Sequence, residues 1–367
     1  MNHKKILILY ASAGAGHKKA AEAICNVAKS RSEQLELIDV VDFMPSLFKR
    51  FYTKGYILLI TRFIWLWTIL YFLSDVPFLS LLNVNFRKFL NAMACRRFIK
   101  YLLGQNPDVV ISTQFLASEI VSYTKEKFHL KTRLMTVVTD FGVHNFWISS
   151  KTDVYCCAAE STKQLLIKKG IDEGRIKITG IPVDEKFTKP QNTEYLLSEF
   201  KLKKDLFTVL IVTGGIGVGP IEKIVELLKE DVQLLVVCGY NSKLYNRLAQ
   251  RRYENVRLFG FVDYIEKLMR ISQLIVTKAG GLTVTESLVT GLPMIFFFLI
   301  PGQEMTNAKM IEARGAGIIA NSPAGIKKAV FYFKNNQQYL ASHKNRVLSL
   351  ARPNSSSEII SLLDSSL

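Results

Sequence analysis

Short apolar runs alternate with amphipathic segments along the first half of the chain. The predicted strands here are Ile6–Tyr10, Leu35–Val40, Asp108–Ser112, Arg133–Thr139, Asp153–Ala158 and Ile176–Gly180. Short apolar runs bounded by turn residues are typical of strands that are buried on both faces. The segments His17–Ser30, Glu119–Phe128 and Ser161–Lys169 between them are predicted helices. This alternation predicts a parallel sheet with helices on both sides.

The same alternation returns in the second half. Its predicted strands are Thr208–Val212, Leu234–Cys238, Val256–Phe259, Leu274–Val276 and Met294–Phe298. Its predicted helices are Ile221–Lys229, Ser242–Ala249, Tyr264–Arg270, Thr283–Thr290 and Asn307–Arg314. A chain of 367 residues is long enough for two such α/β domains. We place them at residues 1–185 and 206–345, joined by a polar linker at 186–205 that includes a helix. We also expect a C-terminal helix within 346–367 that packs back on the first domain.

Residues 45–105 form an insertion of a different character in the first domain. Between Asp42 and Asp108, nine Lys and Arg face one acid, Asp75, which gives +8 of the chain's net charge of +17. The basic residues lie among bulky apolar ones, a pattern that favours an anionic membrane surface over nucleic acid. The candidate membrane-contacting residues are Trp65, Trp67, Arg87, Lys88, Arg96 and Arg97.

One stretch of this insertion requires a decision about membrane spanning. Tyr56–Leu73 is eighteen residues long and carries Arg62 near its middle. That length is marginal for a span, and an arginine near the bilayer centre is costly. We predict a helix that lies in the interface, with a buried core helix as the alternative. The short apolar run at Ile6 and five cysteines without a C-x-x-C pair indicate a reducing compartment and no signal peptide, so we expect a peripheral protein on the cytoplasmic face of the membrane.

Glycine-rich turns follow the first predicted strand of each domain. In the first turn, SAGAGH, Gly14 and Gly16 leave backbone N–H groups accessible beside His17, and His17 begins a helix. The turn lacks the Gly-Lys-Ser/Thr of a P-loop, and Lys19 stands at the third glycine of a dinucleotide fingerprint. A nicotinamide site that uses Asp39 stays a minor alternative, and a purely structural histidine is another.

The second domain carries two glycine turns. Gly214, Gly215 and Gly217 follow one strand, and Gly280 and Gly281 precede a helix. A helix N-terminus with free N–H groups favours phosphate. Glycine turns in both halves therefore suit the transfer of a group from a phosphorylated donor to a second substrate.

Several motifs together resemble the diacylglycerol glycosyltransferases, a family that includes monogalactosyldiacylglycerol synthases and processive diacylglycerol glucosyltransferases and is related to the peptidoglycan lipid I GlcNAc transferase. They are SAGAGH, YTKGYILL, WLWTILYFLSD, VVTDFGVHNFW, ITGIPVDEKF, TKAGGLTVTESLVTGLPMI and PGQEMTNA, in order from about Lys5 to Ala320. The resemblance implies a GT-B fold, in which two Rossmann-like domains face a cleft. It also implies inverting transfer from UDP-glucose or UDP-galactose to diacylglycerol, without a bound metal or covalent cofactor.

The resemblance also implies roles for single residues. His17 is the expected base or places the acceptor, and Asp140 is the rival base, unless it caps a helix. His144 and Trp147 are expected at the acceptor mouth. The expected donor-binding residues are Gly214, Gly215, Gly217, Gly280, Gly281, Leu282 and Thr283 for diphosphate, Glu286 for ribose, Phe261 and Val262 for uracil, and Gln303, Glu304 and Asn307 for the sugar.

Departures from the family pattern and two alternatives accompany this interpretation. The Gly214–Gly219 loop, GGIGVG, is an uncommon variant. Ala279 and Thr306 stand where the family often has proline and glycine, which affects the details of phosphate and sugar contact. One alternative is another lipid-acceptor transferase of the same superfamily that uses UDP-GlcNAc. The other is a membrane protein that senses UDP-sugars without turnover.

Overall fold

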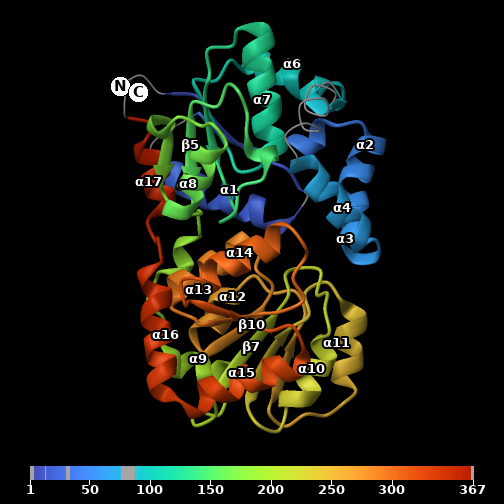
Figure 1. Ribbon diagram of the computed structural model, residues 1–367, viewed down its shortest axis with the longest axis vertical. Helices are drawn as coiled ribbons and strands as arrows, with labels where there is room; N and C mark the ends of the chain where they lie inside the picture. Colours follow the sequence, from blue (N-terminus) through green and yellow to red (C-terminus); the bar gives the residue numbers. More distant parts are fainter. Residues whose placement is uncertain (1–3, 13, 30–33, 76–86, 89, 365–367) are drawn as a thin grey trace. The chain divides into compact units, whose positions relative to one another are not determined.

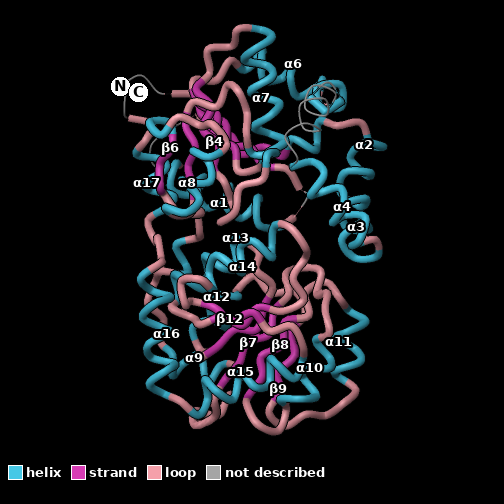
Figure 2. The backbone as a smooth tube through the Cα atoms, viewed as in Figure 1, coloured by secondary structure: helices cyan, strands magenta, loops and turns pink. Residues whose placement is uncertain are grey.

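The computed structural model describes residues 4–12, 14–29, 34–75, 87–88 and 90–364 (Figure 1). The chain divides into two compact units. The first comprises Met1–Asp184, Pro301–Gln303 and Asn354–Leu367, and the second comprises Glu185–Ile300 and Glu304–Pro353. Each unit contains one parallel sheet of six strands (Figure 2).

The first sheet has the order β2-β1-β3-β4-β5-β6. Its strands are β1 (Ile6–Tyr10), β2 (Leu35–Asp39), β3 (Val109–Ser112), β4 (Arg133–Val137), β5 (Val154–Cys157) and β6 (Ile176–Ile178). Alternate residues of β1 enter different cores, because successive side chains of a strand point to opposite faces. Ile6 and Ile8 pack with α1 and α17, whereas Leu7 and Leu9 pack with α6 and α7. The six apolar runs of the first half are therefore the six strands.

Helices cover both faces of this sheet. They are α1 (Ala15–Ala28), α6 (Arg96–Gln105), α7 (Phe115–Phe128), α8 (Glu160–Lys168) and α17 (Ser355–Ser361). Short turns of 3-10 helix are η1 (Val40–Phe43), η3 (Asn145–Trp147) and η4 (Glu173–Arg175). The C-terminal helix α17 packs against α1.

The insertion forms a group of short helices beside the first sheet (Figure 1). They are α2 (Ser46–Arg50), the π-helical turn η2 (Phe51–Gly55), α3 (Tyr56–Arg62) and α4 (Ile64–Asp75). The single helix expected over Tyr56–Leu73 is thus two helices, because the backbone leaves helical geometry at Phe63, with φ −123° and ψ 45°. Part of the predicted insertion, residues 76–86 and 89, lies outside the described residues.

Many apolar side chains of the insertion are exposed. The most exposed are Phe51, at 80%, Leu47, at 76%, and Trp65, at 61%. Among the described residues, none of the helices combines the length and the apolar character needed to span a bilayer. A surface of this kind is uncommon on a protein that contacts only water.

The second sheet has the order β12-β11-β10-β7-β8-β9. Its strands are β7 (Thr208–Val212), β8 (Gln233–Val237), β9 (Val256–Phe259), β10 (Leu274–Thr277), β11 (Met294–Phe296) and β12 (Gly317–Ile319). Its helices are α9 (Thr193–Glu199), α10 (Ile221–Leu228), α11 (Ser242–Ala249), α12 (Ile265–Arg270), α13 (Gly281–Thr290), α14 (Gln303–Glu312), α15 (Pro323–Asn335) and α16 (Gln337–Ser349), with the 3-10 turn η5 (Glu185–Phe187).

The start of one helix differs from the sequence-based expectation. Helix α14 begins at Gln303 and not at Asn307, so Gln303 and Glu304 lie in its first turn. The helix expected in the linker region is α9, and residues 185–205 pack with the second unit.

Candidate functional site

His17 lies in the first turn of α1, at the carboxyl edge of the first sheet. Its Nδ1 is 2.9 Å from the carbonyl oxygen of Thr113, which follows β3. The same nitrogen is 3.0 Å from Oγ1 of Thr139, which follows β4. Loops after three strands, β1, β3 and β4, therefore meet at this imidazole.

These contacts determine which nitrogen of His17 can accept a proton. A carbonyl oxygen only accepts hydrogen bonds, so Nδ1 carries the hydrogen and donates it to Thr113. Nε2 is then the basic nitrogen. Burial lowers the pKa of His17, and the nearby Asp140 carboxylate opposes this by a smaller amount. A neutral imidazole with a free Nε2 lone pair is the state that a general base needs.

Asp140 lies three residues beyond β4 and is buried, with 4% of its surface exposed. Within the first unit, its Oδ1 accepts a hydrogen bond of 2.6 Å from Nε2 of Gln303. Gly14 is the N-cap of α1, and Gly16 lies in its first turn, directly before His17. Gly14 is exposed, and a Cβ there would have no atom within 4 Å. Asp39 accepts hydrogen bonds from the backbone N–H groups of Ser12 and Val41, so it braces this turn.

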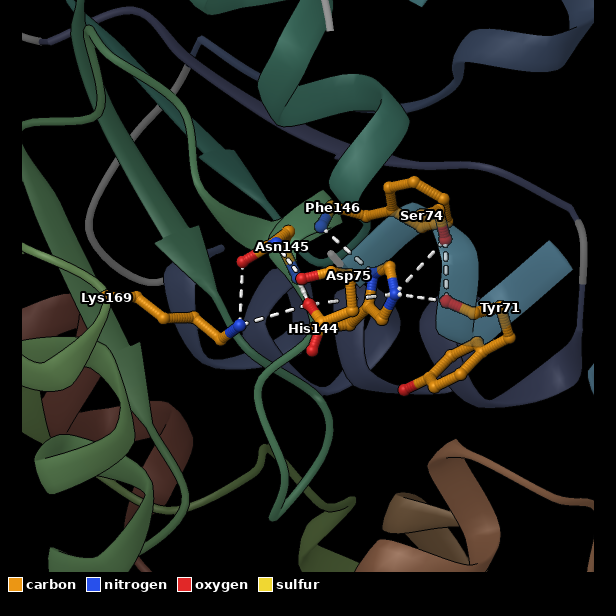
Figure 3. Close-up of polar contacts among 7 residues, drawn as sticks. All are labelled: Tyr71, Ser74, Asp75, His144, Asn145, Phe146 and Lys169. Atoms are coloured by element: carbon orange, nitrogen blue, oxygen red, sulfur yellow. Dashed lines mark hydrogen bonds and ion pairs between the residues drawn. The ribbon is translucent and has the colours of Figure 1, made fainter. Parts of the chain in front are cut away.

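His144 is buried and caps η3 (Figure 3). Its Nδ1 accepts from the backbone N–H of Phe146 at 3.1 Å, so Nε2 carries the hydrogen and donates to the carbonyl oxygen of Tyr71 at 3.2 Å. Burial lowers the pKa of His144 and keeps the ring neutral. Trp147 is also buried, in the core beside β5. We expect both side chains at the acceptor mouth, and this stays a prediction. In the structure, His144 joins η3 to α4, and the centre of the Trp147 ring lies 6.2 Å from that of His17.

The candidate membrane residues do not behave alike. Arg87 pairs with the buried Glu119, with 3.2 Å between Nε and Oε1, and its guanidinium stacks 4.5 Å from the ring centre of Phe146. Arg96 and Arg97 are exposed, whereas Lys88 and Trp67 are partly buried. Arg96 and Arg97 are therefore the cations of this set that face water, whereas Arg87 helps to hold the insertion on α7.

The glycine loop after β7 is braced by the loop after β8. A Cβ at Gly217 would lie 2.1 Å from the carbonyl oxygen of Cys238, and the residue has φ of +62°. Asn241 Nδ2 donates to Gly217 O at 2.8 Å, and Tyr240 N donates to Gly215 O at 2.8 Å. Gly214 is exposed and has φ of +76° with open space at its Cα. Gly217 is thus required by packing, whereas Gly214 has open space beside it.

Helix α13 begins directly at the second glycine pair. Gly280 is its N-cap and provides no side-chain cap, and Gly281 is its first residue. Leu282 and Thr283 lie in the same first turn, and Glu286 is partly buried one turn later. The N-terminal N–H groups and the helix dipole make this turn suitable for an anion.

Lys278, which sequence reasoning missed, joins this loop to α14. Its Nζ is 3.2 Å from Oε1 of Glu304, and both side chains are mostly buried. The other carboxylate oxygen of Glu304 accepts from Ile300 N at 2.9 Å. Asn307 is fully buried and donates through Nδ2 to Ala279 O at 3.0 Å. Asn307 therefore supports the glycine loop, whereas Glu304 is held in a fixed orientation at the start of α14.

Two aromatic side chains extend the carboxyl edge of the second sheet. Phe261, after β9, and Tyr240, after β8, are exposed and stack with ring centres 4.6 Å apart and planes 12° from parallel. Val262 follows as a partly buried residue. The pair offers a flat apolar surface beside the glycine loop.

Comparison with known proteins identifies the family. The model of monogalactosyldiacylglycerol (MGDG) synthase matches residues 17–183, and that of the glycosyltransferase family 28 C-terminal domain matches residues 209–345. The chain is 31% identical over 349 residues to a protein of Staphylococcus aureus (strain MRSA252) named processive diacylglycerol beta-glucosyltransferase, covering 93% of this chain and 87% of that one. The chain belongs to the diacylglycerol glycosyltransferase family. The resemblance stated from the motifs is thereby confirmed.

Solved structures agree on the fold. MurG of Acinetobacter baumannii matches with a TM-score of 0.63 at 18% identity, covering 98% of this chain and 99% of its own. Anabaena HepE in complex with UDP matches with a TM-score of 0.60 at 14% identity, covering 99% and 100%. The predicted α/β class and GT-B fold are confirmed.

Proposed function

We propose that this protein transfers a hexose, with inversion, from UDP-glucose or UDP-galactose to the free hydroxyl of 1,2-diacylglycerol at a membrane surface. Family membership supports the acceptor class, since the similar S. aureus protein is named for a diacylglycerol acceptor. The single observation within the site that supports catalysis concerns His17. Its Nδ1–H is hydrogen-bonded to Thr113 O, and burial favours the neutral ring.

In the proposed reaction, His17 Nε2 takes the proton from the acceptor hydroxyl. The hydroxyl oxygen forms a bond to the anomeric carbon as the bond from that carbon to the diphosphate oxygen breaks, and UDP leaves with the electron pair. Direct displacement inverts the anomeric centre. Thr113 O stabilises the imidazolium through Nδ1–H, and Asp140 adds a compensating negative charge. Asp140 is then a positioning and charge-stabilising group, with a direct base role as its alternative.

In the donor site, we assign the diphosphate to the first turn of α13 and to the loop at Gly214 and Gly215. Backbone N–H groups there stabilise the charge that develops on the leaving group. Glu286 accepts hydrogen bonds from the ribose hydroxyls. Glu304 accepts hydrogen bonds from the sugar hydroxyls, and Gln303 donates hydrogen bonds to them. Phe261 and Val262 hold uracil. Lys278 keeps the Glu304 carboxylate oriented.

The proposal includes peripheral attachment to anionic lipid. Its support is the exposed apolar surface of α2, η2, α3 and α4 together with the exposed Arg96 and Arg97. Apolar burial and attraction to anionic headgroups add to one another in interfacial binding.

The test uses the purified full chain, vesicles that contain diacylglycerol, and UDP-glucose, UDP-galactose or UDP-GlcNAc, with mass analysis of the lipids. The proposal expects a hexosyl-diacylglycerol with one of the first two donors and none with His17→Ala. Product with UDP-GlcNAc alone would assign a different donor class. UDP-sugar binding without any lipid product would indicate a sensor and overturn the proposal.

A further inference from the structure

The last described turn of α4 is joined to η3 and to the end of α8, in the same unit, through one carboxylate (Figure 3). Asp75 Oδ1 accepts from the backbone N–H of Asn145 at 3.0 Å and from Lys169 Nζ at 3.0 Å. Asn145 also donates through Nδ2 to the Asp75 carbonyl oxygen at 3.0 Å, and its Oδ1 accepts from Lys169 at 2.6 Å. With the bond from His144 to Tyr71, these contacts connect α4, η3 and the end of α8.

Asp75 is chemically exceptional at this place. It is the only acid between Asp42 and Asp108, and it is the last residue of α4 that the structure describes. A partly buried carboxylate loses hydration and needs a cation or hydrogen-bond donors in compensation. Here Lys169 provides the cation and Asn145 the donor, which indicates that the acid serves the joint.

The joint connects two parts of the molecule that differ in character. On one side, α4 carries exposed apolar residues, among them Trp65, Leu70 and Leu73. On the other, Asn145 ends the segment that begins after β4, and this segment also carries Thr139, 3.0 Å from His17 Nδ1, and Asp140. The segment is anchored at Asp75 near one end and contacts the proposed base near the other.

We propose that Asp75 is a positioning residue that holds the membrane-facing helix α4 at a fixed place relative to His17, so that an acceptor hydroxyl at the bilayer surface reaches the base. This inference rests on the proposed function. Docking itself depends on the exposed apolar and basic side chains, and the joint determines where docking places the catalytic segment.

The test compares two acceptors. One is long-chain diacylglycerol in anionic vesicles, and the other is a short-chain diacylglycerol dispersed as monomers. Because the position of reacting groups to within an ångström controls rate, Asp75→Ala and Lys169→Met are expected to lower kcat/KM on vesicles by about 10- to 100-fold. Their activity on the short-chain acceptor, their vesicle binding and their UDP affinity are expected to stay at wild-type values.

Lys163→Met is the matched control. Lys163 lies on α8, the helix that Lys169 caps. Its side chain is 19% exposed against 21% for Lys169, and it pairs with Glu173 at 2.6 Å instead of with Asp75. It should act as wild type on both acceptors. Asp75→Asn retains an oxygen for Asn145 N–H but loses the charge, and its loss on vesicles should be intermediate.

Three results would overturn the inference. Equal losses on both acceptors would indicate a general structural role, and lost vesicle binding would place Asp75 in docking itself. Wild-type activity of Asp75→Ala on vesicles would show that the joint has no effect. A wild-type protein that binds vesicles and UDP but makes no glycolipid would instead refute the proposed function on which this inference rests.

Discussion

Replacing Leu47 and Phe51 by serine should weaken vesicle binding strongly. Their side chains are 76% and 80% exposed. Moving a whole Leu or Phe side chain out of water is worth about 1.5–3 kcal/mol. Scaled by exposure and allowing for partial insertion in the interface, each contributes about 1.5 kcal/mol. The pair therefore contributes about 3 kcal/mol, which corresponds to about a 100-fold change in the vesicle partition coefficient.

The assay is co-sedimentation with vesicles over a range of lipid concentrations. Tyr195→Ser is the control, because Tyr195 is 63% exposed on α9 of the second unit, outside the insertion. It should bind vesicles as wild type does. Activity on a short-chain, monomeric diacylglycerol should be unaffected in both variants. If the double variant partitions within threefold of wild type, the exposed apolar surface is not the docking surface.

A second arm separates charge from apolar contact. Arg96 and Arg97 are exposed on α6, and each basic residue near an anionic surface contributes about 1 kcal/mol. Changing both to glutamine should weaken binding to anionic vesicles by about 30-fold at low salt, and less at high salt where charges are screened. Binding to neutral vesicles should not change. Equal losses on the two vesicle types would refute the electrostatic part.

Three further predictions concern the site and the fold. His17→Ala should lower kcat by about 10²- to 10⁴-fold without changing UDP affinity. In the wild type, kcat/KM should stay constant from pH 8 down to pH 6.5, the ordinary pKa of histidine, and should decrease only at lower pH, because burial lowers the pKa of His17. A midpoint above pH 6.5 would contradict the base role. Lys278→Met should raise KM for the UDP-sugar but leave UDP affinity unchanged. It should have no further effect when Glu304→Gln is already present, which steady-state kinetics of the two single variants and the double variant will test. Burial lowers the pKa of His343 to about 4, so the folded state binds fewer protons than the unfolded state below pH 6.5. The second unit should therefore lose about 3 kcal/mol of its free energy of unfolding as the pH falls from 6.5 to 4. Denaturant unfolding should show this loss in the wild type and not in His343→Leu.

The strands could be predicted because a parallel sheet buries both of its faces, and its strands therefore appear as uninterrupted apolar runs. Strand β12, Gly317–Ile319, escapes prediction because it begins with a glycine and follows Gly315 and Ala316, residue types that are depleted in strands. The starts of α13 and α14 were placed too late. Gly281 begins α13 and Gln303 begins α14. For α13 the reason is that glycine has a low intrinsic helix propensity.

The candidate site was predictable in its residue types and not in its contacts. His17 was identified from its position after a strand and glycines, but its bonds to Thr113 and Thr139 join residues 96 and 122 positions apart. The only trace of them is a threonine within two positions of the end of each of two strands, Thr113 after β3 and Thr139 after β4. Arg87 illustrates the opposite failure: counted as a surface cation, it pairs with Glu119, whose burial depends on packing between α7 and the insertion.

Sheet order explains why these residues gather where they do. In the first unit, β1 lies between β2 and β3, and the helices that follow β1 and β3 cover opposite faces. A crevice opens outside the carboxyl ends of the strands at such a switch point, and His17 and Thr113 follow those two strands. In the second unit, β7 and β10 form the corresponding pair, followed by the loop at Gly214 and by the first turn of α13. A glycine turn after the first strand of a doubly wound unit is therefore the sequence feature from which a site at the switch point can be predicted, before any contact is known.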